Sequence, residues 1–285
     1  YLKKTIIFIF FKIFKKYKRF RHLFLSKVFE RKTLRTLKTM IVAVDAINAF
    51  EKVKNNSHSL VDKKILDFLD EYRVELSKNE NKINFKEIGN NKTFSISQIA
   101  LKAASSKKWT SFFYELSKIK NVNNILEIGT NLGVSGQYFL KGLDEKTKSI
   151  FITIDGVKKL CEMATNRFNH ISDKRRFKVI NGLYDEKLLE LKKLNIKFDL
   201  VFIDGNHRFD ATIKYFELLK KHLAQNAIVI FDDIHWSSGM TRAWESIIKD
   251  DSICFSIDFF KLGLIILNSK HKSKFNLKHN LFLSY

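Results

Sequence analysis

The sequence predicts an α/β fold in which a mostly parallel sheet, with helices on both faces, ends in an antiparallel hairpin and is preceded by N-terminal helices. Two observations support this prediction. From residue 123 onward, short apolar runs alternate with helical segments, as expected when helices connect parallel strands. Near the end, two further apolar runs meet at residues 261–263 without an intervening helix, which indicates a hairpin.

The expected elements follow this pattern along the chain. Residues 40–120 are predicted to be mainly helical, and a polar stretch at 77–92 is expected to link the helices. The predicted strands are 125–128, 150–154, 177–180, 200–203, 227–231, 253–259 and 262–268. The predicted helices are 65–76, 96–104, 108–119, 134–143, 158–169, 185–193, 209–224 and 238–249. We therefore divide the chain into a basic segment (1–39), a helical region expected to cover a substrate (40–120) and the α/β domain (121–285).

Composition restricts the class of protein. With 45% hydrophobic and 29% charged residues among 285, the chain has a globular composition, which excludes wholesale disorder. The two cysteines, Cys161 and Cys254, are too few for a disulfide framework and are predicted to be buried thiols in a reducing compartment. Proline is absent from the sequence, and we have no physical account of that absence.

The positive charge is concentrated at the start of the chain. Residues 1–39 contain 13 Lys and Arg and one acid, Glu30, within a total formal charge of +22. On a helix over residues 5–21, one face carries Ile6, Ile9, Phe10, Ile13, Tyr17 and Phe20, and another carries Lys12, Lys15, Lys16 and Arg19. The apolar run is too short to span a bilayer, so the segment predicts a helix lying on anionic lipid. The alternative is a helix packed on the rest of the chain or on a partner.

Two strand ends suggest a ligand site. The first reads Asn124-Ile-Leu-Glu127-Ile-Gly129-Thr-Asn-Leu-Gly133, a strand that ends in an acid and a glycine turn. Glycine lets a ligand approach the main chain closely, and an acid suits a cationic ligand better than a pyrophosphate. Asp155 closes the next strand, 26 residues after Gly129, near the spacing at which an acid binds a ribose. The alternatives are a structural turn for the first motif and a helix cap for Asp155.

Three more carboxylates follow the next two strands. Asp204 ends one strand, and Asp232 and Asp233 end the other. Adjacent parallel strands bring their carboxyl ends to one edge, where these groups would repel each other unless a cation or protons intervened. Oxygen ligands of this kind fit Mg²⁺, whereas the alternative is that one aspartate caps the following helix. His207 and His235 are predicted to face the same cleft, and Trp236 to form either a substrate wall or part of the core.

The segments ILEIGTNLG and FDLVFIDGNH, together with the Asp155 strand end, resemble class I methyltransferases. The resemblance is strongest to small-molecule O-methyltransferases of the catechol and macrocin type and to bacterial proteins with an IDGNHR…FDDIHW signature. It covers residues 121–270 well, 40–120 faintly and 1–39 not at all. It implies a Rossmann-like, doubly wound sheet of seven strands and S-adenosylmethionine as the methyl donor.

The resemblance also implies roles for individual residues. Glu127 would lie near the methionine end of the cofactor, Gly129 beneath it and Asp155 at its ribose. Asn181 and Gly182 would hold the adenine. Thr130, Gly133 and Asp204 complete the implied cofactor site, and Asp204, Asp232 and Asp233 would hold the metal. Some metal-dependent relatives have D-G-D where this chain has Asp204-Gly205-Asn206. An asparagine cannot act as a base, which moves that role to His207, with Asp204 beside it, or to the metal alone.

The resulting hypothesis is methylation of a hydroxyl on a small molecule, with a divalent metal holding the substrate oxygen and His207 accepting its proton. The alternatives are an RNA methyltransferase, which the missing RNA-binding module disfavours, and a non-catalytic membrane-associated protein that retains the fold. A nicotinamide-dependent oxidoreductase is disfavoured because the G-x-G-x-x-G motif is missing. We expect a cytoplasmic protein, with attachment to the inner face of the membrane through residues 5–21 and a homo-oligomeric state left open.

Overall fold

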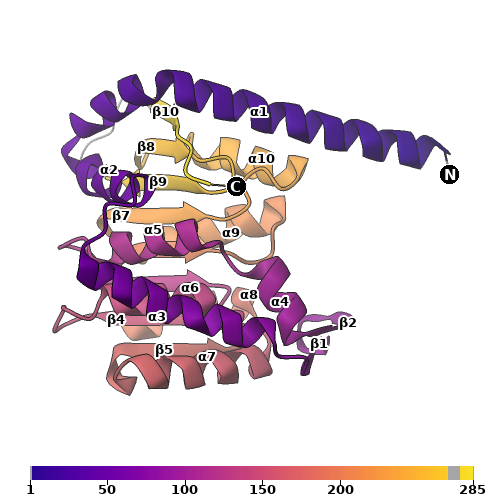
Figure 1. Ribbon diagram of the computed structural model, residues 1–285, viewed down its shortest axis with the longest axis vertical. Coiled ribbons are helices and arrows are strands. Elements are labelled where there is room, and N and C mark those ends of the chain that lie inside the picture. Colours follow the sequence, from indigo (N-terminus) through magenta and orange to yellow (C-terminus); the bar gives the residue numbers. More distant parts are fainter. Residues whose placement is uncertain (1, 269–276, 285) are drawn as a thin grey trace.

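The computed structural model describes residues 2–268 and 277–284, and the side chains of residues 16–268 and 278–284 (Figure 1). Its main sheet has the strand order β10-β8-β9-β7-β6-β3-β4-β5. The strands are β3 (Asn124–Ile128), β4 (Ile150–Asp155), β5 (Phe177–Asn181), β6 (Phe198–Ile203), β7 (Leu223–Phe231), β8 (Ile253–Asp258), β9 (Gly263–Leu267) and β10 (Leu277–Asn280). Strand β9 is antiparallel to both of its neighbours, and the other pairings are parallel.

The predicted fold class is therefore confirmed, with one correction. The sheet has eight strands rather than seven, because β10 adds to β8 at the edge. The predicted hairpin is formed by β8 and β9, in which Asp258 pairs with Gly263. Both cysteines are free thiols; Cys161 is buried and Cys254 is half-buried.

Helices cover both faces of the sheet (Figure 1). On one face, α2 (Ile41–Lys54), α5 (Lys107–Ser117), α6 (Val134–Gly142) and α7 (Lys158–Ile171) share a core with the sheet. On the other face lie α8 (Tyr184–Glu190), α9 (Phe209–Lys220) and α10 (Ser238–Ile247). Ile125 belongs to the first core and its neighbour Leu126 to the second, because successive strand residues point to opposite faces. Burial on both faces explains why these strands are continuous apolar runs in the sequence.

The region before the sheet is not a separate body. Trp109 and Phe113 of α5 lie in the same core as Phe202 of β6, so α5 packs directly on the sheet. The remaining N-terminal elements are α1 (Leu2–Lys38), α3 (Leu60–Ser77), β1 (Lys82–Phe85), the short 3₁₀ helix η1 (Lys86–Ile88), β2 (Asn90–Ser95) and α4 (Ile96–Ala103). Two further 3₁₀ helices, η2 (Lys174–Arg176) and η3 (Leu191–Leu194), lie within the α/β domain.

The prediction of a polar linker at 77–92 is wrong, because this stretch contributes to the antiparallel hairpin β1–β2. Ile83 is buried while its neighbours Lys82 and Asn84 are exposed, which is the alternation of a strand with one covered face. Gly89 makes the turn with a φ of 74°, in the left-handed region that favours glycine.

Helix α1 crosses the β10 edge of the sheet and extends past it, away from the rest of the molecule (Figure 1). His22 and Leu37 are buried against the domain, and the His22 ring contacts the carbonyl oxygen of Leu281 at 3.0 Å. The helix predicted over 5–21 is thus part of a longer one. Of the side chains predicted to form its two faces, those at positions up to 15 lie outside the described residues. None of the helices in the described part of the chain is long and apolar enough to cross a membrane.

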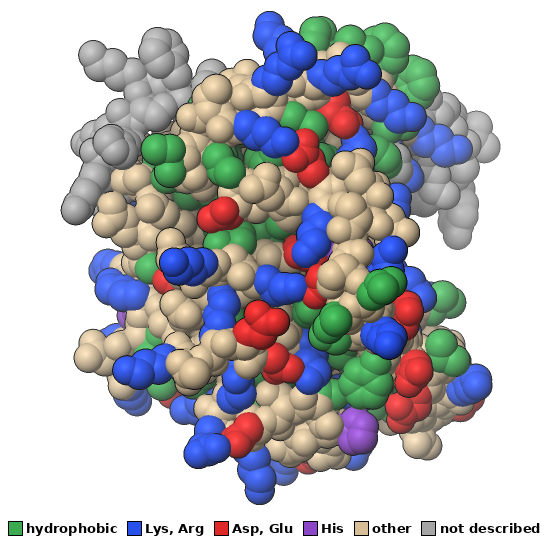
Figure 2. Space-filling view, turned by 60° about the vertical axis from the view of Figure 1, so that its left-hand side comes forward, with side chains coloured by type: hydrophobic (Ala, Val, Ile, Leu, Met, Phe, Trp, Pro, Cys, Tyr) green, Lys and Arg blue, Asp and Glu red, His purple; other side chains and the backbone are tan. Residues whose placement is uncertain are grey.

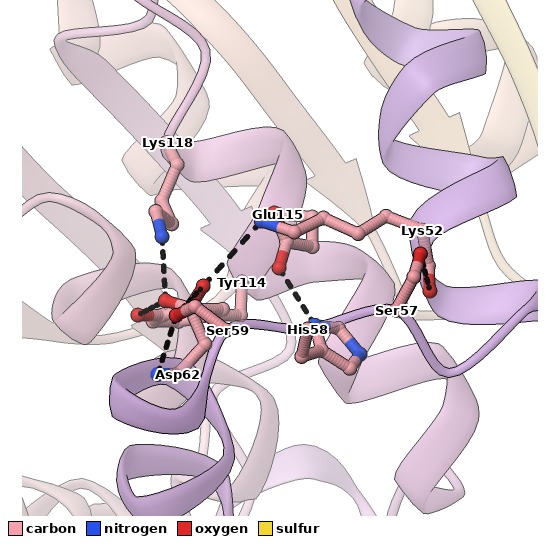
Figure 3. Close-up of polar contacts among 8 residues, drawn as sticks. All are labelled: Lys52, Ser57, His58, Ser59, Asp62, Tyr114, Glu115 and Lys118. Atoms are coloured by element: carbon pink, nitrogen blue, oxygen red, sulfur yellow. Dashed lines mark hydrogen bonds and ion pairs between the residues drawn. The ribbon is translucent and has the colours of Figure 1, made fainter.

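A buried polar cluster ties together the helices that precede the sheet (Figure 3). We call it the helix cluster, and its members are Lys52, His58, Asp62, Tyr114, Glu115 and Lys118. Asp62 and Glu115 are only 4% and 6% exposed. Lys118 Nζ lies 2.5 Å from Asp62, and Lys52 Nζ lies 3.0 Å from Glu115 and 3.4 Å from Asp62. Residues 40–120 contain no recognisable motif, so this cluster was not predicted from the sequence.

Candidate active site

The loop between β3 and α6 needs glycine at its first position. Gly129 has a φ of 106°, and a Cβ there would lie 2.1 Å from the carbonyl oxygen of Asp204. The ends of β3 and β6 therefore approach so closely that a side chain at residue 129 would displace one of them. Gly133 begins α6 with a φ of 75°, and Thr130 is fully buried with its hydroxyl 2.6 Å from that of Thr153. All three predicted loop residues thus shape the loop.

Glu127 lies beneath this loop and is completely buried. The hydroxyl groups of Ser135 and Thr153 donate hydrogen bonds to its carboxyl group. Burial raises the pKa of Glu127 to about 8, against the effect of these two hydrogen bonds. In this position the side chain supports the loop, and its predicted role at the methionine end of the cofactor stays a prediction.

Asp155 organises the next two strand ends. Its carboxylate accepts hydrogen bonds from the backbone N–H groups of Asn131 and Val157, at 2.8 and 2.9 Å. Its backbone carbonyl accepts hydrogen bonds from the Asn181 side chain at 3.1 Å and from Gly182 N–H at 2.9 Å. The residues predicted at the ribose and at the adenine therefore adjoin each other, and burial raises the pKa of Asp155 despite its two backbone donors.

Two segments before the sheet also reach this edge. The backbone N–H of Lys158 donates to Glu87 at 2.8 Å, and a Cβ on Gly156 would meet Ile88 at 2.4 Å. A pocket beside the loop is lined by residues 103–105, by loop residues from Gly129 to Ser135 and by Asp204. Residues of 40–120 thus line the pocket or lie over the end of β4, and their predicted role in covering a substrate stays a prediction.

The carboxylates predicted at the ends of β6 and β7 do lie together. Among the described residues, Asp204, His207 and Asp232 offer potential ligand atoms that lie within 4.8 Å of one another. His207 Nε2 is 3.4 Å from Asp204 Oδ1. Lys261, which the sequence analysis missed, places its ammonium group 2.9 and 3.0 Å from the two oxygens of Asp232 and 2.8 Å from Asp233. We call these five residues the strand-end cluster.

Lys261 changes the interpretation of the predicted metal site. Its ammonium group already binds both oxygens of Asp232 and one oxygen of Asp233, where a cation held by that pair would have to bind. The oxygen ligands suit Mg²⁺ chemically, but the lysine competes with a metal for two of the three predicted ligands. The metal site at Asp204, Asp232 and Asp233 therefore stays a prediction.

The charges of the cluster act on His207. Burial lowers the pKa of this histidine, but the Asp204 carboxylate, with smaller effects of Asp232 and Asp233, outweighs burial and leaves the pKa above its ordinary value. Burial and the neighbouring carboxylates raise the pKa of Asp232 well above its ordinary value, although Lys261 acts in the opposite direction. His207 thus has a proton partner in Asp204 and lies where the negative charge is in excess.

The other two predicted residues have different surroundings. His235 contacts Asp258 at 2.9 Å through Nε2 and Thr241 at 3.1 Å through Nδ1, so both ring nitrogens are engaged outside the strand-end cluster. Trp236 is 58% exposed, which rules out the alternative that it belongs to the core.

Comparisons with known proteins agree with this geometry. A family model described as a methyltransferase domain matches residues 126–234, which contain the glycine loop and most of the strand-end cluster. An uncharacterised protein of Acanthamoeba polyphaga mimivirus is 30% identical over 134 residues, which is 44% of this chain. The chain spans 59% of the length of that relative.

Solved structures share the fold at low sequence identity. An O-methyltransferase from Bacillus cereus, solved with S-adenosylhomocysteine, has a TM-score of 0.55 and 19% identity, over 75% of this chain and 99% of that one. TomG from Streptomyces achromogenes, solved with S-adenosylmethionine, has a TM-score of 0.51 and 20% identity, over 58% of this chain and 82% of that one. A methyltransferase-domain family model thus covers residues 126–234, and the chain shares its fold with these methyltransferase structures.

Proposed function

We propose that this protein is a class I methyltransferase that transfers the methyl group of S-adenosylmethionine to a hydroxyl of a small molecule. The observation that carries the proposal is the position of Asp204, which lines the pocket beside the glycine loop and contacts His207. The pocket thus adjoins a possible proton acceptor. The two solved neighbours are O-methyltransferases, which supports oxygen as the methylated atom.

The residues present fit the cofactor. Gly129 and Asp204 both line the pocket, and the Asp204 carboxylate supplies a negative charge that favours a cationic ligand. Asp155 and the adjoining Asn181–Gly182 turn supply the polar groups expected at the ribose and adenine. When bound, S-adenosylmethionine would supply an electrophilic methyl group.

The chain itself would supply orientation and a base. Methyl transfer is a direct displacement, so the protein must align the hydroxyl with the methyl group rather than form a covalent intermediate. His207 would take the hydroxyl proton, with Asp204 orienting the ring and stabilising the imidazolium that forms. Because the neighbouring carboxylates raise the pKa of His207, the neutral ring that can act as a base forms at a higher pH than in an ordinary histidine. No step requires a metal, because Lys261 already balances part of the charge on Asp232 and Asp233.

The test is calorimetric titration of S-adenosylmethionine into the protein. We expect a dissociation constant on the order of micromolar, weakened in Asp155→Ala and in the isosteric Asp155→Asn. Asp173→Ala is the matched control: its carboxylate also accepts a backbone hydrogen bond, but it is exposed and precedes β5, at the opposite end of that strand from Asn181. The proposal would be contradicted if the wild-type protein did not bind S-adenosylmethionine, or if both Asp155 variants bound it with the wild-type dissociation constant. The predicted contacts with a membrane through residues 5–21 and with a second copy of the chain stay predictions.

A further inference from the structure

One face of α1 is apolar although it is turned away from the molecule. Its members are Tyr17, Phe20, Phe24 and Val28, whose exposed fractions are 60%, 67%, 58% and 56%. Their spacing of three, four and four residues places them on one side of the helix, and we call this set the α1 stripe. It begins where the described side chains begin and continues one face predicted from the sequence for residues 5–21.

The α1 stripe lies opposite the face that packs on the domain. His22 and Ser26 lie two positions before and two positions after Phe24 in the sequence, and they are only 8% and 0% exposed. At about 100° per residue, this spacing puts them roughly 160° from Phe24 around the helix. The stripe is therefore not the margin of a buried interface. Since monomeric proteins rarely expose a contiguous row of large apolar side chains, it indicates a binding surface.

The charges beside the stripe indicate what it binds. Exposed basic residues follow its length, namely Lys16, Arg21, Lys27, Arg31, Lys32 and Arg35. The one acid in the α1 sequence, Glu30, forms an ion pair with Lys54 of α2 and so faces the domain. Figure 2 shows basic and hydrophobic side chains together along the top of the molecule, over α1. An apolar stripe bordered by positively charged side chains is complementary to a surface that is anionic outside and apolar beneath.

We propose that the α1 stripe and its basic border dock α1 in the plane of an anionic lipid surface. The apolar side chains insert among the acyl chains, while the lysine and arginine side chains reach the lipid phosphates. Because α1 crosses the β10 edge of the sheet, docking turns that edge toward the lipid (Figure 1). The proposal does not depend on the methyltransferase activity, since no residue of the candidate active site takes part.

The test is binding of the full chain to vesicles of equal parts phosphatidylcholine and phosphatidylglycerol, measured by co-sedimentation. We expect binding that weakens as salt is added and that is weak on phosphatidylcholine alone. The double variant Phe20→Ser with Phe24→Ser should lower the partition coefficient at least about tenfold. Phe29→Ser is the matched control, because Phe29 is 51% exposed but lies roughly 140° from Phe24 around the helix, and it should bind like wild type.

A second pair of variants tests the charges. Lys27→Gln with Arg31→Gln should lower the partition coefficient roughly twentyfold, since each basic residue near an anionic surface contributes about a fivefold gain. Lys159→Gln with Lys174→Gln removes the same charge from exposed sites near β4 and β5, away from α1, and should change it much less. Wild-type binding by the Phe20 and Phe24 double variant would overturn the proposal. The proposal would also be overturned if the wild-type protein were a dimer without lipid, the double variant were a monomer, and both bound vesicles equally. The stripe would then bind a second copy of the chain.

Discussion

The helix cluster and the strand-end cluster are both partly buried and both charged, yet they are built differently. In the helix cluster, two carboxylates face two lysines, and each carboxylate has further partners in a tyrosine, a serine or a histidine. Although burial alone would raise the pKa of Asp62, hydrogen bonds from Lys118, Ser59 and Tyr114 hold it well below its ordinary value. In the strand-end cluster, three carboxylates face one lysine and one histidine.

This difference separates structural charge from functional charge. A balanced cluster stabilises the fold, and the helix cluster joins α2, α3 and α5. A cluster with unbalanced charges lowers the stability of the fold. Proteins retain such a cluster mainly where a ligand or a reaction uses its electric field. The comparison therefore predicts that the two clusters respond in opposite ways to the removal of one carboxylate.

The largest expected effect is on turnover in Asp204→Asn. The substitution keeps the shape but removes the carboxylate that lines the pocket and contacts His207, so turnover should fall by roughly 10²–10³-fold. The free energy of unfolding, measured in urea, should not fall, because one of three like charges has gone. Full turnover in this variant, or a large fall in its free energy of unfolding, would show that Asp204 stabilises the fold rather than acts in the reaction.

The mirror experiment is Asp62→Ala. It leaves Lys118 and Tyr114 without their carboxylate, and the free energy of unfolding should fall by about 3 kcal/mol, the lower end of the range for breaking a buried ion pair. Turnover per folded molecule should stay unchanged. Asp185→Ala serves as the control, because its ion pair with Lys214 is more than half exposed on both sides and should contribute less than about 1 kcal/mol. A loss of turnover in folded Asp62→Ala would show that the two clusters are not separate.

Much of this arrangement could be predicted from the sequence, for a physical reason. Strands buried on both faces leave long apolar runs, so the seven predicted strands of the sheet correspond to β3 to β9 with small shifts at their ends. The β1–β2 hairpin was missed because Ile83 and Phe85 alternate with lysine and asparagine, which resembles a polar linker. Strand β10 was missed because its pairing with β8 is not visible in the local pattern.

The site was predictable where backbone topology decides it. Parallel strands bring Asp204 and Asp232 to one edge, whatever the side chains do. The position of Lys261 depends on the register between β7 and β9, in which Gly263 pairs with Phe231, so that residue 261 lies beside Asp232 and Asp233. His235 was predicted in the cleft because it follows a strand end, but a residue in such a loop can turn either way. Here Asp258, across the hairpin, binds its ring.

Glu127 extends the comparison between balanced and unbalanced carboxylates, because its carboxyl group has hydroxyl partners but no lysine. With the pKa of Glu127 raised to about 8, the folded state retains a proton that the unfolded chain releases above about 4.5. Stability should therefore fall as pH rises between about 5 and 8, by up to roughly 1.4 kcal/mol per pH unit. Glu127→Gln should remove this part of the slope, which urea denaturation at several pH values measures. An identical slope in both proteins would mean that Glu127 is ionised when folded.

The smallest expected effect concerns metal ions, and it tests whether Lys261 completes the strand-end cluster. Since its ammonium group already binds Asp232 and Asp233, a chelator should leave wild-type turnover unchanged. Lys261→Met removes that charge and leaves carboxylate oxygens that suit a hard cation, so Mg²⁺ should raise the Tm of this variant and not that of the wild type. If the chelator instead abolishes wild-type turnover and Mg²⁺ restores it, Lys261 must leave the carboxylates during the reaction, and the metal site predicted from the sequence is correct.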